Sequence, residues 1–170
     1  EDYQKAYDLD YTILRYGSLY GPRENEHNWI YKTLKQALTE KKMTREGDGE
    51  EIREYIHVHD AAKLSCDILK EEYKNRSLVI AGNTQIKIKD LLVMIKEMLK
   101  GDVDIRYVPA KVKEHYEINP YVFNPKVATK IGSTEYLDMG QGLLSILREI
   151  NQQCIASQTD KDNFVEVSSS

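Results

Sequence analysis

The stretch that decides the fold is residues 46–60, which read EGDGEEIREYIHVHD. Gly47 and Gly49 open it, and glycine tolerates the backbone angles that a tight turn needs. The residues that follow predict a short strand, in which side chains alternate between two faces. Arg53 lies on one face of this strand, and Asp60 stands where the next helix needs an N-cap. The stretch therefore predicts a turn, a strand that carries an arginine, and a capped helix.

The arginine of this strand has two interpretations. A guanidinium group can hold a phosphate through two parallel hydrogen bonds, which makes Arg53 a candidate phosphate ligand. Alternatively, the segment is a surface hairpin in which Arg53 pairs with a neighbouring glutamate. The residues of the stretch by themselves leave both interpretations open.

Strands and helices alternate on both sides of this stretch. Apolar runs at residues 11–14 and 77–83 predict buried parallel strands, and residues 103–108 predict a further strand that ends at Pro109. Asn28 is a candidate N-cap for the first long helix. Helical spacing of apolar residues predicts helices over residues 29–41, 59–73, 88–99, 125–131 and 139–151. This alternation is typical of an α/β fold.

Composition excludes several classes of protein. The 170 residues include 24 basic and 28 acidic side chains, a net charge of −4, whereas a dedicated nucleic-acid binder is expected to be basic. No apolar run approaches the roughly 20 residues that span a bilayer, so we expect no membrane partner. Cys66 and Cys154 are far apart in the sequence and predict free thiols in a reducing compartment, which favours a cytoplasmic location.

Two further predictions come from local composition. His57 and His59 share a strand face, but no cluster of cysteine or acidic residues completes a ligand set, so we expect no metal site. Residues 152–170 are polar with little periodicity, and we expect a disordered tail there.

Four segments, in this order, resemble the C-terminal half of the extended short-chain dehydrogenase/reductase family, which contains the NAD-dependent nucleotide-sugar epimerases and dehydratases. The resemblance covers roughly residues 1–150, and the joint order of the segments is more specific than any one of them. The segments are LRYGSLYGPR at 14–23, GDG at 47–49 with REYIHVHD at 53–60, IAGN at 80–83, and PAK at 109–111 with NPK at 124–126 and IG at 131–132.

This resemblance implies a two-part architecture. Residues 1–21 and 59–83 would be the last strands and helix of a Rossmann-type parallel sheet. Residues 22–58 and 84–151 would form the smaller α/β substrate-binding cap of the extended family. Ligands are then expected beyond the carboxyl ends of the parallel strands.

The resemblance also implies roles for five residues. Tyr16 matches the position that touches the nicotinamide side of the cofactor. Ser18 falls where the family usually has a diphosphate-binding asparagine, and serine keeps a hydroxyl but loses reach. Arg53 matches the arginine that grips the nucleotide diphosphate. Lys111 replaces a second phosphate-binding arginine and keeps the charge without the fork. Glu114 lies where an aspartate usually meets the nucleotide ribose.

The catalytic parts of the family do not occur in this sequence. Hydride transfer with NAD or NADP needs a glycine-rich turn and a Tyr-x-x-x-Lys pair. The spacings Tyr31 to Lys35 and Tyr107 to Lys111 lie on the wrong side of the LRY motif and are interpreted as chance. We therefore expect no catalytic residue here. The prediction is an inactive substrate-binding portion of an epimerase, dehydratase or reductase, whose parent could be a homodimer. The alternative is a non-catalytic nucleotide-sugar-binding or assembly module.

Overall fold

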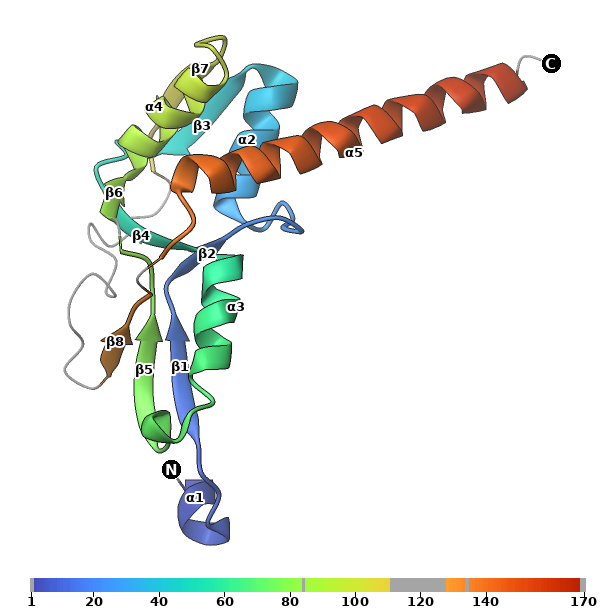
Figure 1. The fold of residues 1–170 in the computed structure, drawn as a ribbon. Coiled ribbons are helices and arrows are strands. Elements are labelled where there is room, and N and C mark those ends of the chain that lie inside the picture. Colours follow the sequence, from blue (N-terminus) through green and yellow to red (C-terminus); the bar gives the residue numbers. More distant parts are fainter. Residues whose placement is uncertain (1, 84, 111–127, 134, 169–170) are drawn as a thin grey trace.

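The computed structural model describes residues 2–83, 85–110, 128–133 and 135–168, and it is an α/β structure (Figure 1). Its strands are β1 (Thr12–Tyr16), β2 (Ser18–Tyr20), β3 (Lys42–Glu46), β4 (Ile52–His57), β5 (Arg76–Ile80), β6 (Gln85–Lys87), β7 (Asp104–Val108) and β8 (Thr129–Ile131). Its helices are α1 (Asp2–Tyr7), α2 (Trp29–Glu40), α3 (Val58–Asp67), α4 (Ile88–Met98) and α5 (Met139–Ser168), with a 3₁₀ turn at Glu71–Tyr73.

One parallel sheet carries the strand order β1-β5-β8. Leu14 of β1 lies opposite Leu78 of β5, so the two predicted strands are confirmed as direct parallel neighbours. The burial predicted for both holds only for β5, whereas no residue of β1 is buried, because β1 lies at the edge of the described sheet. Helix α3 runs alongside this sheet (Figure 1) and packs Leu64 against it in a core cluster that also holds Leu78 and Ile80.

A second group of elements lies beyond the carboxyl ends of β1 and β5 (Figure 1). The chain leaves β1 through Gly17 and enters β2, which pairs in parallel with β4; β4 in turn pairs antiparallel with β6. β3 and β7 form a separate parallel pair. A larger core cluster joins this pair to α2, α4 and the start of α5, and its fully buried members include Leu34, Met43, Leu92, Ile95 and Ile146.

The predicted cap of α2 is confirmed. The Oδ1 atom of Asn28 accepts hydrogen bonds from the backbone N–H groups of Ile30 (2.9 Å) and Tyr31 (3.2 Å). These are donors that the first turn of a helix cannot satisfy internally. The cap also fixes where α2 begins, which matters for the site described below.

The predicted cap of α3 is wrong by three residues. His57 is the N-cap, and its Nδ1 atom accepts from the backbone N–H of His59 at 3.2 Å. Asp60 lies inside the first turn and is buried, and its Oδ2 accepts from the backbone N–H of Leu137 at 2.8 Å. Local sequence could not reveal this because Asp60 is used by a segment far along the chain.

The helix predicted over residues 125–131 is wrong where the structure describes it. Thr129–Ile131 is strand β8, and Ile131 pairs with Ile80 at the edge of the parallel sheet. Residues 125–127 lie outside the described residues. A three-residue strand carries too little pattern to be told from a helical turn, so its partner strand decides its conformation.

The expectation of a disordered tail is also not what the structure shows, because α5 continues through Ser168 and projects away from the body (Figure 1). No glycine or proline follows Gly142, so nothing in the sequence stops the helix. Within the described residues, no helix has the length and apolar character needed to cross a membrane.

Candidate functional site

Two of the predicted substrate-binding residues, Ser18 and Arg53, line one hollow of about 380 Å³, which we call the Arg53 hollow. They come from different motifs, and only the fold brings them together. Among the described residues, the lining consists of Ser18, Leu19, His27, Asn28, Trp29, Ile30, Arg45, Arg53, Tyr55 and Ile88.

The pairing of β2 with β4 explains why Ser18 and Arg53 meet. Ser18 lies directly opposite Tyr55 in the parallel register of the two strands. Arg53 and Tyr55 are two residues apart on one strand, so their side chains leave the same face. The Nη1 atom of Arg53 donates to the backbone oxygen of Ile52 at 3.0 Å, and the side chain is half-buried. Arg53 therefore lines the hollow and is only partly exposed to solvent.

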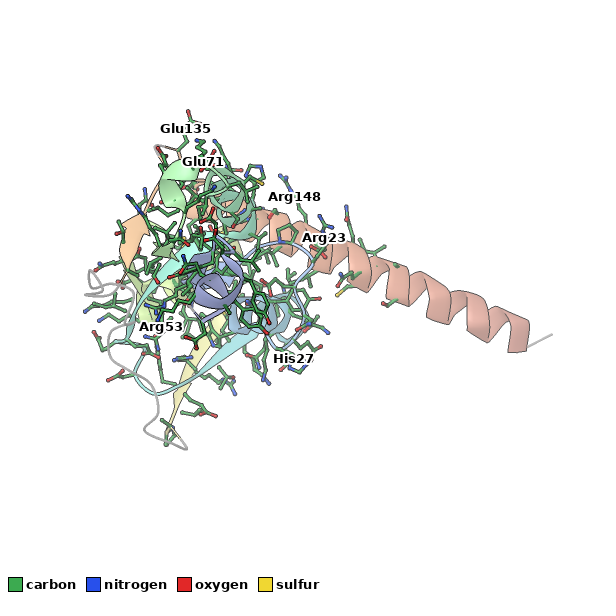
Figure 2. The ribbon with its side chains drawn as sticks, turned by 90° about the horizontal axis from the view of Figure 1, so that it is seen from below. Arg23, His27, Arg53, Glu71, Glu135 and Arg148 are labelled. Atoms are coloured by element: carbon green, nitrogen blue, oxygen red, sulfur yellow. The ribbon has the colours of Figure 1, made fainter. Side chains whose placement is uncertain are left out.

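The N-terminus of α2 forms another wall of the Arg53 hollow. Asn28 caps the helix and also donates from Nδ2 to the backbone oxygen of Leu19 at 3.2 Å, which ties the helix start to β2. A helix N-terminus carries partial positive charge. Arg53 and His27 lie on the same side of the body, away from Glu71 and Glu135 (Figure 2). The hollow is thus suited to an anion.

Burial controls the protonation of the groups in this hollow. Burial raises the pKa of the Tyr55 phenol to about 12, although Arg53 and Arg45 act in the opposite direction. Tyr55 therefore stays protonated at neutral pH and can donate a hydrogen bond but cannot act as a base. Tyr55 is therefore a wall residue of the hollow and not a proton acceptor.

Sequence reasoning missed Arg45, which also lines the Arg53 hollow. Arg45 lies in the middle of β3 and is buried. The only local signal was its position, two residues after buried Met43 and therefore on the inward face of the strand. An arginine at such a position needs partners, and the structure supplies Glu51 and Trp29.

Of the remaining predicted site residues, only Tyr16 lies in the described part of the chain, and it is not among the lining residues of the hollow. Tyr16 ends β1 with 37% of its surface exposed, and its hydroxyl is 2.7 Å from Ser65 Oγ on α3. Its proposed contact with a cofactor stays a prediction. Lys111 and Glu114 lie outside the described residues.

Both residues of one Tyr-x-x-x-Lys spacing, Tyr31 and Lys35, lie in the described part of the structure. Tyr31 donates its hydroxyl to Gln153 Oε1 at 2.8 Å, and Lys35 forms an ion pair with Glu26. Each side chain is therefore engaged separately. This supports the interpretation of the spacing as coincidence.

A second polar cluster joins the two parts of the fold. Tyr20 packs edge-on against His57, with ring centroids 5.2 Å apart, and the Nε2 atom of His57 is buried with no hydrogen-bond partner in the described chain. Burial, with Asp60 and Asp138, raises the pKa of Tyr20 to about 12. Burial lowers the pKa of His57, although Asp60 acts in the opposite direction.

His57 is expected to make stability depend on pH. Because its pKa is lowered in the folded chain, the unfolded chain binds the proton first as pH falls through about 6.5. Its contribution is full above that pH and is lost below it. We expect the melting temperature to fall more between pH 7.5 and 5.5 in the unaltered chain than in His57→Asn, which keeps a capping oxygen. Equal falls in the two proteins, measured by circular dichroism, would contradict this assignment.

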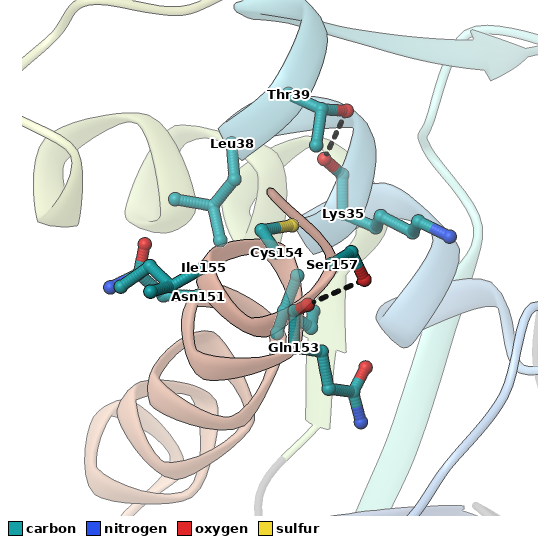
Figure 3. A pocket seen from close by; sticks show the side chains of 9 residues that line it. Lys35, Leu38, Thr39, Asn151, Gln153, Cys154, Ile155 and Ser157 are labelled. Carbon is teal, nitrogen blue, oxygen red and sulfur yellow. Dashed lines mark hydrogen bonds between the residues drawn. The ribbon is translucent and has the colours of Figure 1, made fainter. Parts of the chain in front are cut away.

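A larger hollow of about 580 Å³ lies between α2 and α5, but several of its polar side chains already bond to other groups (Figure 3). Thr39 donates to the backbone oxygen of Lys35 and Ser157 to that of Gln153, so both hydroxyls are used within their own helices. Lys35, the only basic group among the described lining residues, is paired with Glu26. In addition, no group of three or more histidine, cysteine or acidic side chains among the described residues is placed to hold a metal ion. The Arg53 hollow is therefore the stronger candidate.

Comparison with known proteins gives a consistent picture. Residues 1–81 match the model of the NAD dependent epimerase/dehydratase family. CDP-abequose synthase of Salmonella typhimurium is 24% identical over 152 residues, which cover 87% of this chain and 51% of that protein. An uncharacterized protein of Schizosaccharomyces pombe is 31% identical over an alignment of 178 positions, and the alignment covers 88% of this chain and 49% of that protein. The chain thus spans about half the length of these relatives.

Solved structures show the same fold. The UDP-glucuronic acid 4-epimerase of Bacillus cereus, in complex with UDP-glucuronic acid and NAD, aligns with a TM-score of 0.73 and 21% identity. The alignment covers 89% of this chain and 48% of that chain. The α/β fold with parallel sheets is therefore that of the epimerases, and the sequence matches show homology to nucleotide-sugar epimerases and dehydratases.

Proposed function

We propose that this chain is the C-terminal, substrate-binding portion of an NAD-dependent epimerase/dehydratase of the extended short-chain dehydrogenase/reductase family, which acts on a nucleotide-linked sugar. The observation that carries the proposal is that Ser18 and Arg53, selected from separate motifs, line one hollow beside the N-terminus of α2. The match of residues 1–81 to the family model is consistent with it.

The proposed role of the hollow is to hold the diphosphate of the substrate. A guanidinium group, a hydroxyl and a helix N-terminus are the groups that proteins use for phosphate oxygens. Arg53 would neutralise charge, and Ser18 would donate a hydrogen bond. The sugar would thereby be oriented towards the carboxyl ends of β1 and β5. These residues bind and position the substrate and take no part in proton transfer.

NAD or NADP is assigned mainly to a part of the protein outside this chain. The cofactor supplies a hydride acceptor when bound. In the described chain no glycine-rich turn follows β1, which continues through Gly17 directly into β2, and this supports the assignment. Tyr16, at the end of β1, is the one residue that we assign to the cofactor.

The proposed division is into a Rossmann-type part, residues 1–21 and 59–83, and a cap, residues 22–58 and 84–151. The two core clusters follow it only in part, because Ile56 and Ile131 of the proposed cap pack in the cluster of the parallel sheet and Tyr20 packs in the other cluster. In the strand order β1-β5-β8, β1 is an edge strand of the described sheet, and Ile13 on it is 37% exposed. An open edge with an exposed apolar residue is a place for further strands to pair. We assign this edge to the cofactor-binding half.

Arg53→Ala tests the proposal. We expect this variant to bind a UDP- or CDP-linked sugar roughly ten- to a hundredfold more weakly, as for the loss of a charge-assisted hydrogen bond. The measurement is isothermal titration calorimetry on the full chain. Arg76→Ala is the matched control, because Arg76 is exposed at the far end of β5 and should bind as the unaltered chain does. Unchanged affinity in Arg53→Ala would exclude the role.

A non-catalytic binding or assembly module is the second candidate. Ser18 and Lys111, which replace the asparagine and arginine that are usual in the family, favour it. An intact glycine-rich turn and Tyr-x-x-x-Lys pair elsewhere in the full protein, together with turnover of a nucleotide sugar, would exclude it. The 170-residue chain alone is expected to turn over no substrate. The cytoplasmic location and the homodimer also stay predictions.

A further inference from the structure

Arg45 stands at the boundary between two hollows. It lines the Arg53 hollow and also a neighbouring hollow of about 470 Å³, and Trp29 is shared in the same way. Among the described residues, the second lining consists of Trp29, Lys32, Thr33, Gln36, Thr44, Arg45, Glu46 and Val108. Arg45 is therefore reached from two sides although only 10% of its side chain is exposed.

Arg45 contacts two side chains, but one of its hydrogen-bond donors has no partner in the described chain. Its Nη2 atom donates to Oε1 of Glu51, whose side chain is 9% exposed. Its guanidinium carbon lies 5.2 Å from the centroid of the Trp29 ring, within the range of a cation–π contact. The buried Nε atom has no hydrogen-bond partner in the described chain. A buried donor without a partner is costly, so an unpaired donor on a residue that lines a hollow calls for an explanation.

The guanidinium groups of Arg45 and Arg53 both line the Arg53 hollow, and no carboxylate is among its described lining residues. The charge of Arg45 is paired with Glu51, which is not a lining residue. Burial lowers the pKa of Arg45, and the nearby charge of Arg53 acts in the same direction. An anion bound between the two guanidinium groups would be attracted by both.

We infer that Arg45 is a second anion-binding side chain of this hollow, and that the hollow takes a diphosphate between the guanidinium groups of Arg45 and Arg53. The inference rests on the proposed function and deepens it. It adds Arg45, on β3, to the phosphate-binding residues that the family resemblance implied, which were Ser18, Arg53 and Lys111. The competing role for Arg45 is a purely structural ion pair with Glu51.

The sole tryptophan of the chain makes the inference measurable. Trp29 contacts Arg45 and lines both hollows, so its fluorescence should change when an anion binds there. The probes are inorganic pyrophosphate and UDP, titrated into the full chain. Arg45→Met alone would leave Glu51 buried and unpaired, so Arg45→Met is combined with Glu51→Gln. The matched control is Arg45→Lys, which keeps both the cation and its pairing with Glu51.

We expect the double variant, if it is folded by circular dichroism, to bind both probes roughly ten- to a hundredfold more weakly than Arg45→Lys. Equal affinity of the folded double variant and its control would overturn the inference. If Arg53→Ala is weakened in the same titration while the double variant is not, the proposed function stands and only the role of Arg45 fails. Unchanged affinity of Arg53→Ala, or no binding to the unaltered chain, would overturn the proposed function as well.

Discussion

Gly82→Ala is expected to destabilise the fold by about 3 kcal/mol or more, the largest effect of any single methyl group that we can identify. A Cβ atom on Gly82 would lie 1.9 Å from the backbone oxygen of Tyr55 and 2.9 Å from its carbonyl carbon. Backbone atoms cannot rotate away as a side chain can. The strand that carries Tyr55 is also held on both sides, by β2 and by β6.

The measurement is the free energy of unfolding in urea, followed by circular dichroism. Gly140→Ala is the matched control, because its Cβ would come within 3.1 Å only of Oδ1 of Asp138, a side-chain atom that can move. Gly140 lies in the first turn of α5, where alanine is the better helix former. Gly82→Ala should unfold at much lower urea than this control. Similar midpoints for the two variants would show that β4 can move away from β5, contrary to the structure.

Lys130→Met is expected to cost about 3 kcal/mol of stability. Lys130 on β8 donates to Oε1 of Glu54 on β4, and only 1% of the Glu54 side chain is exposed. The other carboxylate oxygen, Oε2, is buried with no partner in the described chain. Removal of Lys130 would therefore leave a buried negative charge without its cation, which is among the most costly changes a protein can suffer.

A double variant separates the lost ion pair from lost packing. Glu54→Met combined with Lys130→Met removes both charges, and we expect it to unfold at higher urea than Lys130→Met alone. Lys130 is 30% exposed, so the methionine has room there. If the single variant is as stable as the unaltered chain, the ion pair contributes nothing measurable. If the double variant is the less stable of the two, Lys130 acts through packing and not through charge.

Local signals in the sequence were sufficient where one segment carried the whole interaction. Asn28 was predicted as the cap of α2 because a capping side chain bonds N–H groups only two and three residues ahead, and the structure confirms it. The parallel strands β1 and β5 were predicted because their apolar character lies in consecutive residues, although the structure buries only β5. Predicting such interactions requires no information about residues far away in the sequence.

The failures involve partners far away in the sequence. Asp60 has the residue type of a cap but is bonded to Leu137, and Thr129–Ile131 has the pattern of a helical turn but pairs with β5. Arg45 was overlooked because a buried arginine on a strand is recognisable only beside Glu51 and Trp29. In each case the deciding contact joins segments that the sequence does not place side by side.

By itself, the sequence determined the α/β class, the parallel strands, most helices and the choice of Ser18 and Arg53 as candidates, because these depend on periodicity and on short motifs. Only the tertiary structure decided that Ser18 and Arg53 share one hollow, that Arg45 joins them, and that Glu54 is buried against Lys130. The physical reason is that strand pairing and burial set which distant side chains meet, and a charge has a defined role only once its neighbours and its access to water are known.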